Sequence, residues 1–370
     1  MNAKKIDSLT SLRFFAAAMI VVGHGDRLFG SPAFIRNIAS AQAVSFFFTL
    51  SGFILAHTYH DRLLDGRSLQ RYFVARITRI WPLHLVTAAA TFCLISGVQA
   101  PLTMAMVNIF LLQSWVPSMP WFFSLNGVAW SISTEAFFYL LFPLLINRIE
   151  STWHWKTLLA CALALTSIAI TACISDNVAF WGAYIFPISR LPEFMIGIAA
   201  YYYFYSHDRQ VTRTRATIVE TAMVLVVFGE MWLSHISASF IHSSQPRLVS
   251  IADWLDSGAG SPAFALLILV FARENGVLSR GLRNRVWVIL GEASFALYMC
   301  HQIIGRMMWD RYTLVKSFPN GLMWSIYIIC AVLLSIALHY FIEKPMRKLI
   351  MKQFDDRFYT NEPPAQARVG

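Results

Sequence analysis

Arg13 and His24 are the two residues of this sequence whose types and spacing most directly suggest chemistry. Both lie inside the first long apolar stretch, residues 9–28. A charge at the centre of a bilayer costs about 3 kcal/mol or more, so an ionisable residue retained there indicates a functional site. The two residues are eleven positions apart. In a helix this spacing is close to three turns, which puts both side chains on one face about 16 Å apart along the axis. That face would present a cation and a base.

The composition is typical of a polytopic membrane protein. Of the 370 residues, 57% are hydrophobic and only 14% are charged, and the mean hydropathy is +0.54. A soluble protein of this length would need a more polar surface. The net charge of +10 comes from short basic clusters between apolar stretches, which indicates membrane topology rather than a nucleic-acid-binding face. The 5 cysteines are scattered without a CxxC pair, which disfavours a disulfide framework or a zinc site.

Ten apolar stretches are long enough to span a bilayer. They are residues 9–28, 41–60, 79–98, 127–147, 157–175, 180–204, 217–240, 249–272, 285–308 and 322–343. The first stretch lacks an A-x-A cleavage site and holds Arg13 in its interior, so we interpret it as a retained helix rather than a signal peptide. A further stretch, residues 101–115, is shorter and opens with Pro101.

The basic clusters constrain the number of crossings. The positive-inside rule places all five clusters in the cytoplasm; they lie at residues 4–5, 62–79, 209–215, 273–285 and 344–352. An even number of crossings must separate the second cluster from the third, yet five apolar stretches lie between them. The short stretch 101–115 is therefore predicted to lie in the interface or to re-enter.

The sequence thus predicts an all-α fold, a polytopic transmembrane helical bundle of about ten spans with both termini cytoplasmic. Residues 1–348 would form one membrane-embedded domain. Residues 349–370, which are polar and contain two adjacent prolines near their end, would form a disordered cytoplasmic tail.

This topology distributes the intramembrane polar residues over two layers. His24 and Glu135 enter at a similar depth near the outer face, so a base and a carboxylate are expected to meet there. The same outer layer holds Arg190, Glu193, His301 and Gln302. Arg76 and Arg79 lie at the opposite, cytoplasmic end, where their planar donors suit phosphate groups. Several ionisable residues in one layer, with an arginine pair at the inner mouth, favour a functional site.

Each of these residues also has a purely structural interpretation. A lone histidine in an apolar helix, such as His24, is more often a hydrogen-bonded packing residue than a catalyst. Arg13 and Glu135 could be structural partners, and Arg76 and Arg79 could be positive-inside anchors alone. The catalytic interpretation gains its weight from the convergence of these residues and not from any one of them.

Taken in order, the motifs around these residues resemble the acyltransferase-3 family of membrane acyltransferases, which O-acylate bacterial surface glycans and some small molecules. The resemblance extends over roughly residues 7–348. It rests on DSLTSLR (7–13) followed by His24, FFFTLSGF (46–53), RITRIWP (76–82), WSISTEAFFY (130–139), PEFMIG (192–197), SFALYMCHQ (294–302) and EKP (343–345). Phe14 stands where the family often has glycine, and Ala136 where it often has a polar or acidic residue. Each motif is weak alone, whereas the ordered set is specific.

The resemblance implies O-acyl transfer from cytoplasmic acyl-CoA, with acetyl-CoA expected, to a hydroxyl of a glycan or lipid-linked saccharide on the outer side. Exopolysaccharide and lipopolysaccharide are acceptors of this kind. The implied catalytic residues are His24, Glu135 and Arg13, and the implied CoA-binding residues are Arg76 and Arg79. The implied substrate-binding residues are Trp130, Ser131, Tyr139, Arg190, Glu193, His301 and Gln302. His24 would take the proton of the acceptor hydroxyl, and Glu135 would orient and tune its ring.

The family resemblance also implies a multi-pass protein of the bacterial inner membrane that uses no metal. Some members carry an additional extracytoplasmic hydrolase-like domain, which is not expected here, so the membrane domain or a separate partner would complete the transfer.

Two other functions stay open from the residues alone. Intramembrane Arg, His and Glu also form relays in transporters and permeases, although no internal repeat of the kind those proteins use is visible. A non-catalytic glycan-assembly protein is the other alternative. The oligomeric state is not indicated.

Overall fold

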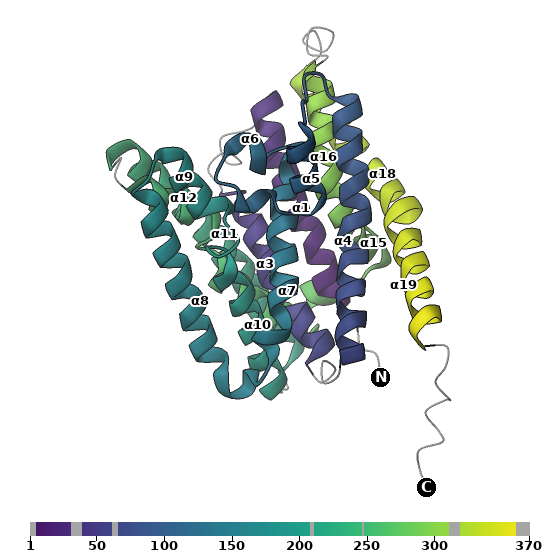
Figure 1. The fold of residues 1–370 in the computed structure, drawn as a ribbon. Helices are drawn as coiled ribbons and strands as arrows, with labels where there is room; N and C mark the ends of the chain where they lie inside the picture. Colours follow the sequence, from purple (N-terminus) through teal and green to yellow (C-terminus); the bar gives the residue numbers. More distant parts are fainter. Residues whose placement is uncertain are drawn as a thin grey trace.

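The computed structural model describes residues 5–30, 39–60, 66–207, 211–245, 248–310 and 319–359. Within these ranges the regular structure is helical and no strand occurs, which confirms the all-α prediction (Figure 1). The α-helices are α1 (Asp7–Phe29), α3 (Gln42–Tyr59), α4 (Gly66–Leu94), α5 (Leu102–Ile109), α6 (Met119–Phe122), α7 (Trp130–Ile146), α8 (Ile149–Ala172), α9 (Asp176–Phe180), α10 (Leu191–Ser206), α11 (Arg213–Ser244), α12 (Val249–Ser257), α13 (Ser261–Ala272), α14 (Val277–Gly281), α15 (Arg285–Glu292), α16 (Ser294–Asp310), α18 (Asn320–Leu338) and α19 (Lys344–Tyr359). The described elements also include the 3₁₀ turns η1 (Gln113–Trp115) and η2 (Gly127–Ala129) and the π-helical turns η3 (Trp181–Ile185) and η5 (His339–Glu343).

Seven helical stretches of the described residues are long and apolar enough to cross a membrane, and the bent pair α15–α16 makes eight if it counts as one span. They are Asp7–Asp26, Ser68–Leu94, Gly127–Ile146, Ile149–Ala172, Arg213–Ser244, Val249–Ala272 and Asn320–Phe358. These helices are those of a multi-pass membrane protein, whereas the predicted number of about ten spans is not confirmed. Part of the difference between the two numbers arises because α3 and α10 are not among these stretches. The two helices have 18 and 16 residues and are largely buried inside the bundle.

The apolar stretch 180–204, predicted as one span, is broken. Residues 186–190 separate the π-helical turn η3 from α10. Phe186 is extended, with φ −62° and ψ 126°, because a residue that precedes a proline, here Pro187, is disfavoured in the helical conformation. Pro192 then occupies the first turn of α10, where a missing N–H costs no hydrogen bond.

Two further predicted spans end differently from expectation. Residues 285–308 form α15 and α16, which meet at an angle of 61°. Residues 322–343 continue through η5 into α19, so the first part of the predicted disordered tail is helical as far as Tyr359. Pro345 cannot donate a backbone hydrogen bond to the turn before it, and the π-helical turn η5 lies directly before α19. The remainder of the predicted tail, residues 360–370, lies outside the described residues.

The short stretch 101–115 forms no helix long enough to span. It folds into α5 and η1, and the chain continues through α6 and η2 into α7. α5 has 8 residues, which amounts to about 12 Å, less than half of the hydrocarbon layer. Asn108 donates to the carbonyl oxygen of Ser124, and Gln113 to that of Ala129, each over 3.0 Å. These bonds satisfy part of the irregular backbone and fix the start of α7.

α3 forms the centre of the bundle and packs against α1, α7, α10 and α13. In Figure 1, α8 lies on one side of α3, whereas α4, α18 and α19 lie on the other. α1 also packs against α15, α16 and α18. The first helix therefore contacts the last third of the described chain along much of its length, and this arrangement brings the predicted site residues of α1 to those of α16.

A glycine on each helix lets α3 and α10 approach closely. A Cβ on Gly52 would collide with the carbonyl oxygen of Phe194, and a Cβ on Gly197 would collide with that of Thr49. Small residues of this kind allow membrane helices to pack backbone against backbone.

Gly197→Val should lower the free energy of unfolding by about 1–3 kcal/mol or more, because added methyl groups force two closely packed helices apart. Thermal unfolding of the detergent-solubilised protein measures the loss. Gly229→Val is the matched control, since Gly229 of α11 has open space around it. Equal melting temperatures for the two variants would contradict the close approach.

Candidate active site

A cavity of about 470 Å³ lies where the first half of α1 meets α3, α4, α7, the α15–α16 corner and η5–α19. Its described lining includes six Lys or Arg side chains and three Glu side chains. The cations are Lys5, Arg13, Arg76, Arg79, Lys344 and Arg347, and the carboxylates are Glu135, Glu292 and Glu343. Because the cations outnumber the carboxylates two to one, the cavity attracts anions.

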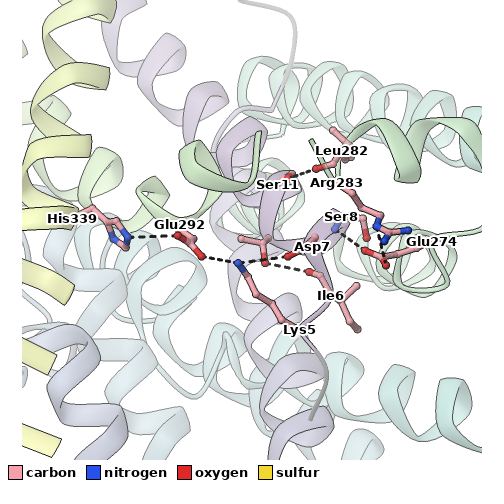
Figure 2. Close-up of polar contacts among 11 residues, drawn as sticks. Lys5, Ile6, Asp7, Ser8, Ser11, Glu274, Leu282, Arg283, Glu292 and His339 are labelled. Atoms are coloured by element: carbon pink, nitrogen blue, oxygen red, sulfur yellow. Dashed lines mark hydrogen bonds and ion pairs between the residues drawn. The ribbon is translucent and has the colours of Figure 1, made fainter. Parts of the chain in front are cut away.

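One wall of the cavity carries a chain of ion pairs and histidine–carboxylate contacts that joins three elements (Figure 2). Lys5 Nζ lies 2.6 Å from Glu292 Oε1 and 3.5 Å from Asp7 Oδ1. Glu292 Oε2 faces the ring of His339, with 3.8 Å to Nε2. His339 Nδ1 lies 3.0 Å from Glu343 Oε2. The chain ties the start of α1 to the end of α15 and to η5, a π-helical turn of the kind that is frequent at functional sites.

The other side of the first turn of α1 is held by Glu274 (Figure 2). The backbone N–H of Ser8 donates to Glu274 Oε1 over 3.0 Å, and Arg283 Nε lies 3.6 Å from Glu274 Oε2. Ser11 Oγ donates to the carbonyl oxygen of Leu282 over 2.5 Å. The carboxylate satisfies one of the free N–H groups of the helix N-terminus. α1 is thus fixed on both sides at its first turns, which already line the cavity.

Glu135 of α7 lines the cavity together with Arg13 of α1. Its Oε1 accepts hydrogen bonds from Tyr139 Oη and, over 3.2 Å, from Ser51 Oγ. Arg13 interacts electrostatically with both Glu135 and Arg79. Two guanidinium groups in one cavity repel each other, so the Glu135 carboxylate offsets part of their charge.

Arg76 and Arg79 both line the cavity from α4. Arg76 is only 7% exposed, and its guanidinium lies over the rings of Tyr59 and Tyr139, 5.5 and 5.8 Å from their centroids. Its Nη2 donates to Tyr59 Oη over 3.3 Å, whereas its Nε has no hydrogen-bond partner among the described residues. A buried donor without a partner is costly. Arg76 therefore has a donor available for an anionic ligand.

Ser131 of α7 and Tyr298 of α16 form another part of the cavity wall. Their hydroxyl oxygens are 2.8 Å apart. They lie 3.1 and 3.0 Å, respectively, from the carbonyl oxygen of Val128. Phe47 packs beside Tyr298, with 6.3 Å between the ring centroids. The ring of His301 lies 6.0 Å from that of Tyr298 and is not part of the described lining. This wall separates the cavity from His301.

His24 of α1 and His301 of α16 are in direct contact. His24 Nδ1 lies 2.9 Å from His301 Nε2, and the two rings are nearly parallel, with 5.1 Å between centroids and 20° between planes. His301 is fully buried, whereas His24 is half-buried. The histidine pair thus lies beyond Tyr298, one aromatic side chain away from the cavity.

The expected contact between His24 and Glu135 is not the one that the structure makes. His24 faces α16, whereas the Glu135 carboxylate faces Ser51 of α3 and the cavity arginines. The topological argument placed His24 and Glu135 at one depth, whereas Glu135 lines the cavity together with Arg13, eleven residues before His24 on the same helix. It did not give the side of the helix on which each partner lies, because that depends on the packing of α1 and α7 against different neighbours.

Arg190 and Glu193 lie outside the cavity in a closed polar network. Arg190 Nε lies 3.1 Å from Glu193 Oε1, and both side chains are buried. Arg190 also donates to Ser45 Oγ over 2.9 Å and to Ser257 Oγ over 3.1 Å, and Ser45 Oγ donates to the carbonyl oxygen of Ser257. The network joins α3, α10 and α12, which indicates a structural role rather than the predicted contact with substrate.

The remaining predicted substrate-binding residues are dispersed. Trp130 is part of the hydrophobic core, Tyr139 is buried with its hydroxyl on Glu135, and Gln302 is half-buried. Ser131 is the one member of the predicted substrate set that the described cavity lining includes.

The cavity lining includes several charged or titratable residues that were not predicted as site residues, among them Lys5, Glu292, His339, Glu343, Lys344 and Arg347. Lys5 and Arg347 belong to basic clusters that the sequence interpretation assigned to topology alone. Glu343 stands in the EKP motif, which was noted without a role. A basic residue directly beside an apolar stretch can serve both topology and ligand binding, and only the packing of distant segments distinguishes the two.

Comparisons with known proteins identify the family to which the chain is similar. The acyltransferase domain of the acyltransferase-3 family matches residues 6–340. The chain is 27% identical over 334 residues to acyltransferase MdmB of Streptomyces mycarofaciens, covering 82% of this chain and 79% of that protein. It is 26% identical over 270 residues to the putative acetyltransferase ORF330 of Acidianus two-tailed virus, covering 72% and 73%. It is 22% identical over 386 residues to O-acetyltransferase OatA of Staphylococcus aureus, covering 95% of this chain and 59% of that protein. No solved structure gives a significant match. The match over nearly the whole chain shows that this protein belongs to the acyltransferase-3 family and is an acyl-transferring enzyme.

Proposed function

We propose that this enzyme is a membrane O-acyltransferase that takes an acyl group, with acetyl expected, from acyl-CoA and transfers it to a hydroxyl of a glycan or lipid-linked saccharide. The observation that carries the proposal is the excess of Lys and Arg over Glu in the cavity lining, because CoA is a polyanion whose phosphates suit fork-shaped guanidinium donors. The name of the relative OatA, an O-acetyltransferase, supports oxygen as the accepting atom.

In the proposed reaction the acceptor hydroxyl attacks the carbonyl carbon of the thioester. The new C–O bond forms, the C–S bond breaks, and CoA leaves as a thiolate. His24 takes the hydroxyl proton as general base and returns it to the thiolate sulfur. Arg13 lies in the cavity on the same helix as His24, so we assign it to the acyl-CoA side of the reaction. Because Ser131 and Tyr298 lie between the cavity and the histidine pair, the thioester reaches His24 when this wall opens.

The proposal places the two substrates on opposite sides of the membrane. The cavity lies beside the first turns of α1 and the basic start of α19, which includes Lys344 and Arg347. The positive-inside rule assigns this end of the bundle to the cytoplasm, where acyl-CoA is available. His24 lies further along α1, toward the face from which the acceptor would enter. We place the protein in a bacterial inner membrane, in line with its bacterial relatives.

The proposed function is tested with the purified chain in lipid nanodiscs, acetyl-labelled acetyl-CoA and a panel of saccharides. We expect saturable donor binding and transfer of label to at least one saccharide. A chain that binds no CoA and moves no label to any acceptor would contradict the proposal.

Arg79→Ala should weaken the binding of acyl-CoA by about 1–3 kcal/mol, because one charge-assisted contact to a phosphate is lost. Arg79→Lys should restore only part of the affinity, since an ammonium lacks the planar fork. Isothermal titration with acetyl-CoA measures both. Arg215→Ala is the matched control, because Arg215 is exposed on α11 and absent from the described lining. Normal CoA binding by an Arg79→Ala protein that inserts poorly would favour the topology-anchor interpretation instead.

A further inference from the structure

Glu220 and Glu230 are two carboxyl groups of the same helix, α11, and their surroundings differ in kind. Glu220 is only 1% exposed and is surrounded by hydrogen-bond donors. Its Oε1 accepts from the backbone N–H of Gly276 and the hydroxyl of Ser279, over 2.9 and 2.5 Å. Its Oε2 accepts from the backbone N–H groups of Leu278 and Ser279, over 3.0 and 3.1 Å. Four donors on two oxygens are the surroundings that suit an ionised carboxylate.

Glu230 has donors on one of its two oxygens. Its Oε1 accepts from Ser234 Oγ over 2.6 Å and from Gln42 Nε2 over 3.3 Å. Its Oε2 is buried and has no hydrogen-bond partner among the described residues. A buried acceptor without a donor is costly, and a charged one is more costly still. The surroundings of Glu230 therefore lack what an ionised carboxylate needs.

The side chain of Gln42, at the start of α3, has an oxygen with the same deficit. Gln42 is fully buried. Its Nε2 donates to the carbonyl oxygen of Leu255 over 2.9 Å as well as to Glu230. Both of these partners are acceptors, so they fix which end of the amide is the NH₂ group. Oε1 of Gln42 is left without a hydrogen-bond partner among the described residues.

The two unpartnered oxygens face the same point. A Cβ on Gly260, between α12 and α13, would collide with both Gln42 Oε1 and Glu230 Oε2. An amide oxygen and a carboxylate oxygen are both acceptors, whereas a protonated carboxyl group has one O–H to donate. A proton on Glu230 Oε2 would therefore supply the missing donor and satisfy both oxygens at once.

The charged groups near this part of α11 are engaged with one another. Among the described residues no Lys or Arg side chain forms an ion pair with Glu230. α13 has no titratable residue, those of α3 lie in its last turn, and α14 packs on the Glu220 end of α11. The remaining groups form pairs: Asp256 with His235, Asp253 with His242, and Glu193 with Arg190, at 2.9, 3.2 and 3.1 Å.

We infer that Glu230 is a proton-binding site: it holds a proton on Oε2, donates it to Gln42 Oε1 and accepts from Gln42 Nε2, so that the two side chains form a ring of two hydrogen bonds. A neutral acid also avoids the cost of a charge inside a membrane-spanning helix. The bound proton joins α11 to α3 and, through the second N–H of Gln42, to Leu255 of α12. Neither Glu230 nor Gln42 belongs to the described cavity lining, and the inference does not depend on the proposed reaction.

The first test detects the proton. Infrared difference spectra of the full chain in nanodiscs compare the parent with Glu230→Gln at neutral pH. We expect this substitution to remove the C=O stretching band of a neutral carboxyl group. Glu220→Gln is the matched control, which should remove carboxylate bands and leave the neutral band in place. If Glu230→Gln removed only carboxylate bands, the inference would be overturned, and a water molecule or a cation would have to lie between the two oxygens.

The second test compares thermal stability at neutral pH in detergent. Glu230→Gln should melt at the temperature of the parent or above it, because the new amide N–H replaces the acid O–H toward Gln42. Glu220→Gln should lower the melting temperature by several degrees, since it turns an NH₂ group toward donors. A Glu230→Gln chain that is destabilised as strongly as Glu220→Gln, or that fails to fold, would contradict the bound proton.

The third test follows the melting temperature with pH. An unfolded chain releases the proton of an ordinary glutamate above about pH 4.3, whereas the folded chain retains that of Glu230. The folded state then binds more protons, so its stability falls as the pH rises. Relative to Glu230→Gln, which lacks this dependence, the parent should gain stability as the pH is lowered from neutral. A parent that loses stability relative to Glu230→Gln on acidification would overturn the inference.

Discussion

His24→Ala should lose at least a hundredfold in the rate of acyl transfer per folded molecule while it binds acyl-CoA as the parent does. General-base catalysis is typically worth about 10²–10⁴ in rate, and the described lining of the cation-rich cavity does not include His24. His24→Gln should not restore the rate, because an amide can form hydrogen bonds but cannot take the proton. The loss should therefore appear in kcat and not in donor affinity.

The measurement combines transfer of labelled acetyl groups, isothermal titration with acetyl-CoA and thermal unfolding, all on protein in nanodiscs. His84→Gln controls for the loss of a buried histidine that lies outside the pair and the described cavity lining. If His24 were a packing residue, the loss of rate would follow the loss of stability, and glutamine would substitute acceptably. A folded His24→Ala protein that transfers acyl groups near the parent rate would exclude the mechanism.

Arg190→Met should lower the free energy of unfolding by about 3–5 kcal/mol, because it leaves a buried carboxylate without its partner. Arg190 and Glu193 lie 3.1 Å apart and are both buried, and the two serines bonded to Arg190 lose a donor as well. Adding Glu193→Gln to the same chain should recover part of the loss, since it removes the uncompensated charge.

Unfolding in a titration with denaturing detergent measures this loss. Arg71→Met is the matched control: Arg71 lies 3.0 Å from Asp355, but the pair is exposed, and exposed pairs contribute about 1 kcal/mol or less. If Arg190→Met were as stable as Arg71→Met and had lost affinity for the acceptor instead, the substrate-binding role predicted from the sequence would be correct and the structural role wrong.

The hydropathy of the sequence located most of the helices. A helix in hydrocarbon satisfies its backbone hydrogen bonds internally, so a sufficient length of apolar side chains is enough to predict it. Hydropathy could not show where an apolar stretch breaks. Pro187 was a visible signal for the break within 180–204, but a single proline in a membrane helix often produces only a kink. The angle of 61° between α15 and α16 and the extension of α19 to Tyr359 depend on packing against α1 and α4, which no local pattern records.

The sequence showed which polar residues lie inside the apolar helices, but not how these residues group together. Arg13 and Arg79 were both predicted to lie toward the cytoplasmic end of the bundle, and the structure places both in one cavity. The partner of His24 was predicted as Glu135, whereas the contact is with His301. Counting residues from the membrane surface gives the height of a side chain along the axis. Which neighbour it meets depends on the rotation of its helix, and that is set by contacts with segments more than two hundred residues away.

The hydroxyl groups of Ser131 and Tyr298 affect whether protons can pass from the cavity to the histidine pair. A proton can hop along hydroxyl groups only if each oxygen passes on a proton as it receives one. Both hydroxyls lie at the carbonyl oxygen of Val128, and a carbonyl accepts a hydrogen bond but has no proton to hand on. The path from the cavity through these two hydroxyls therefore ends at the backbone before it reaches the histidine pair. In the function proposed above, this wall, while closed, would let the enzyme hold acyl-CoA in the cavity without a proton leak through these two hydroxyls.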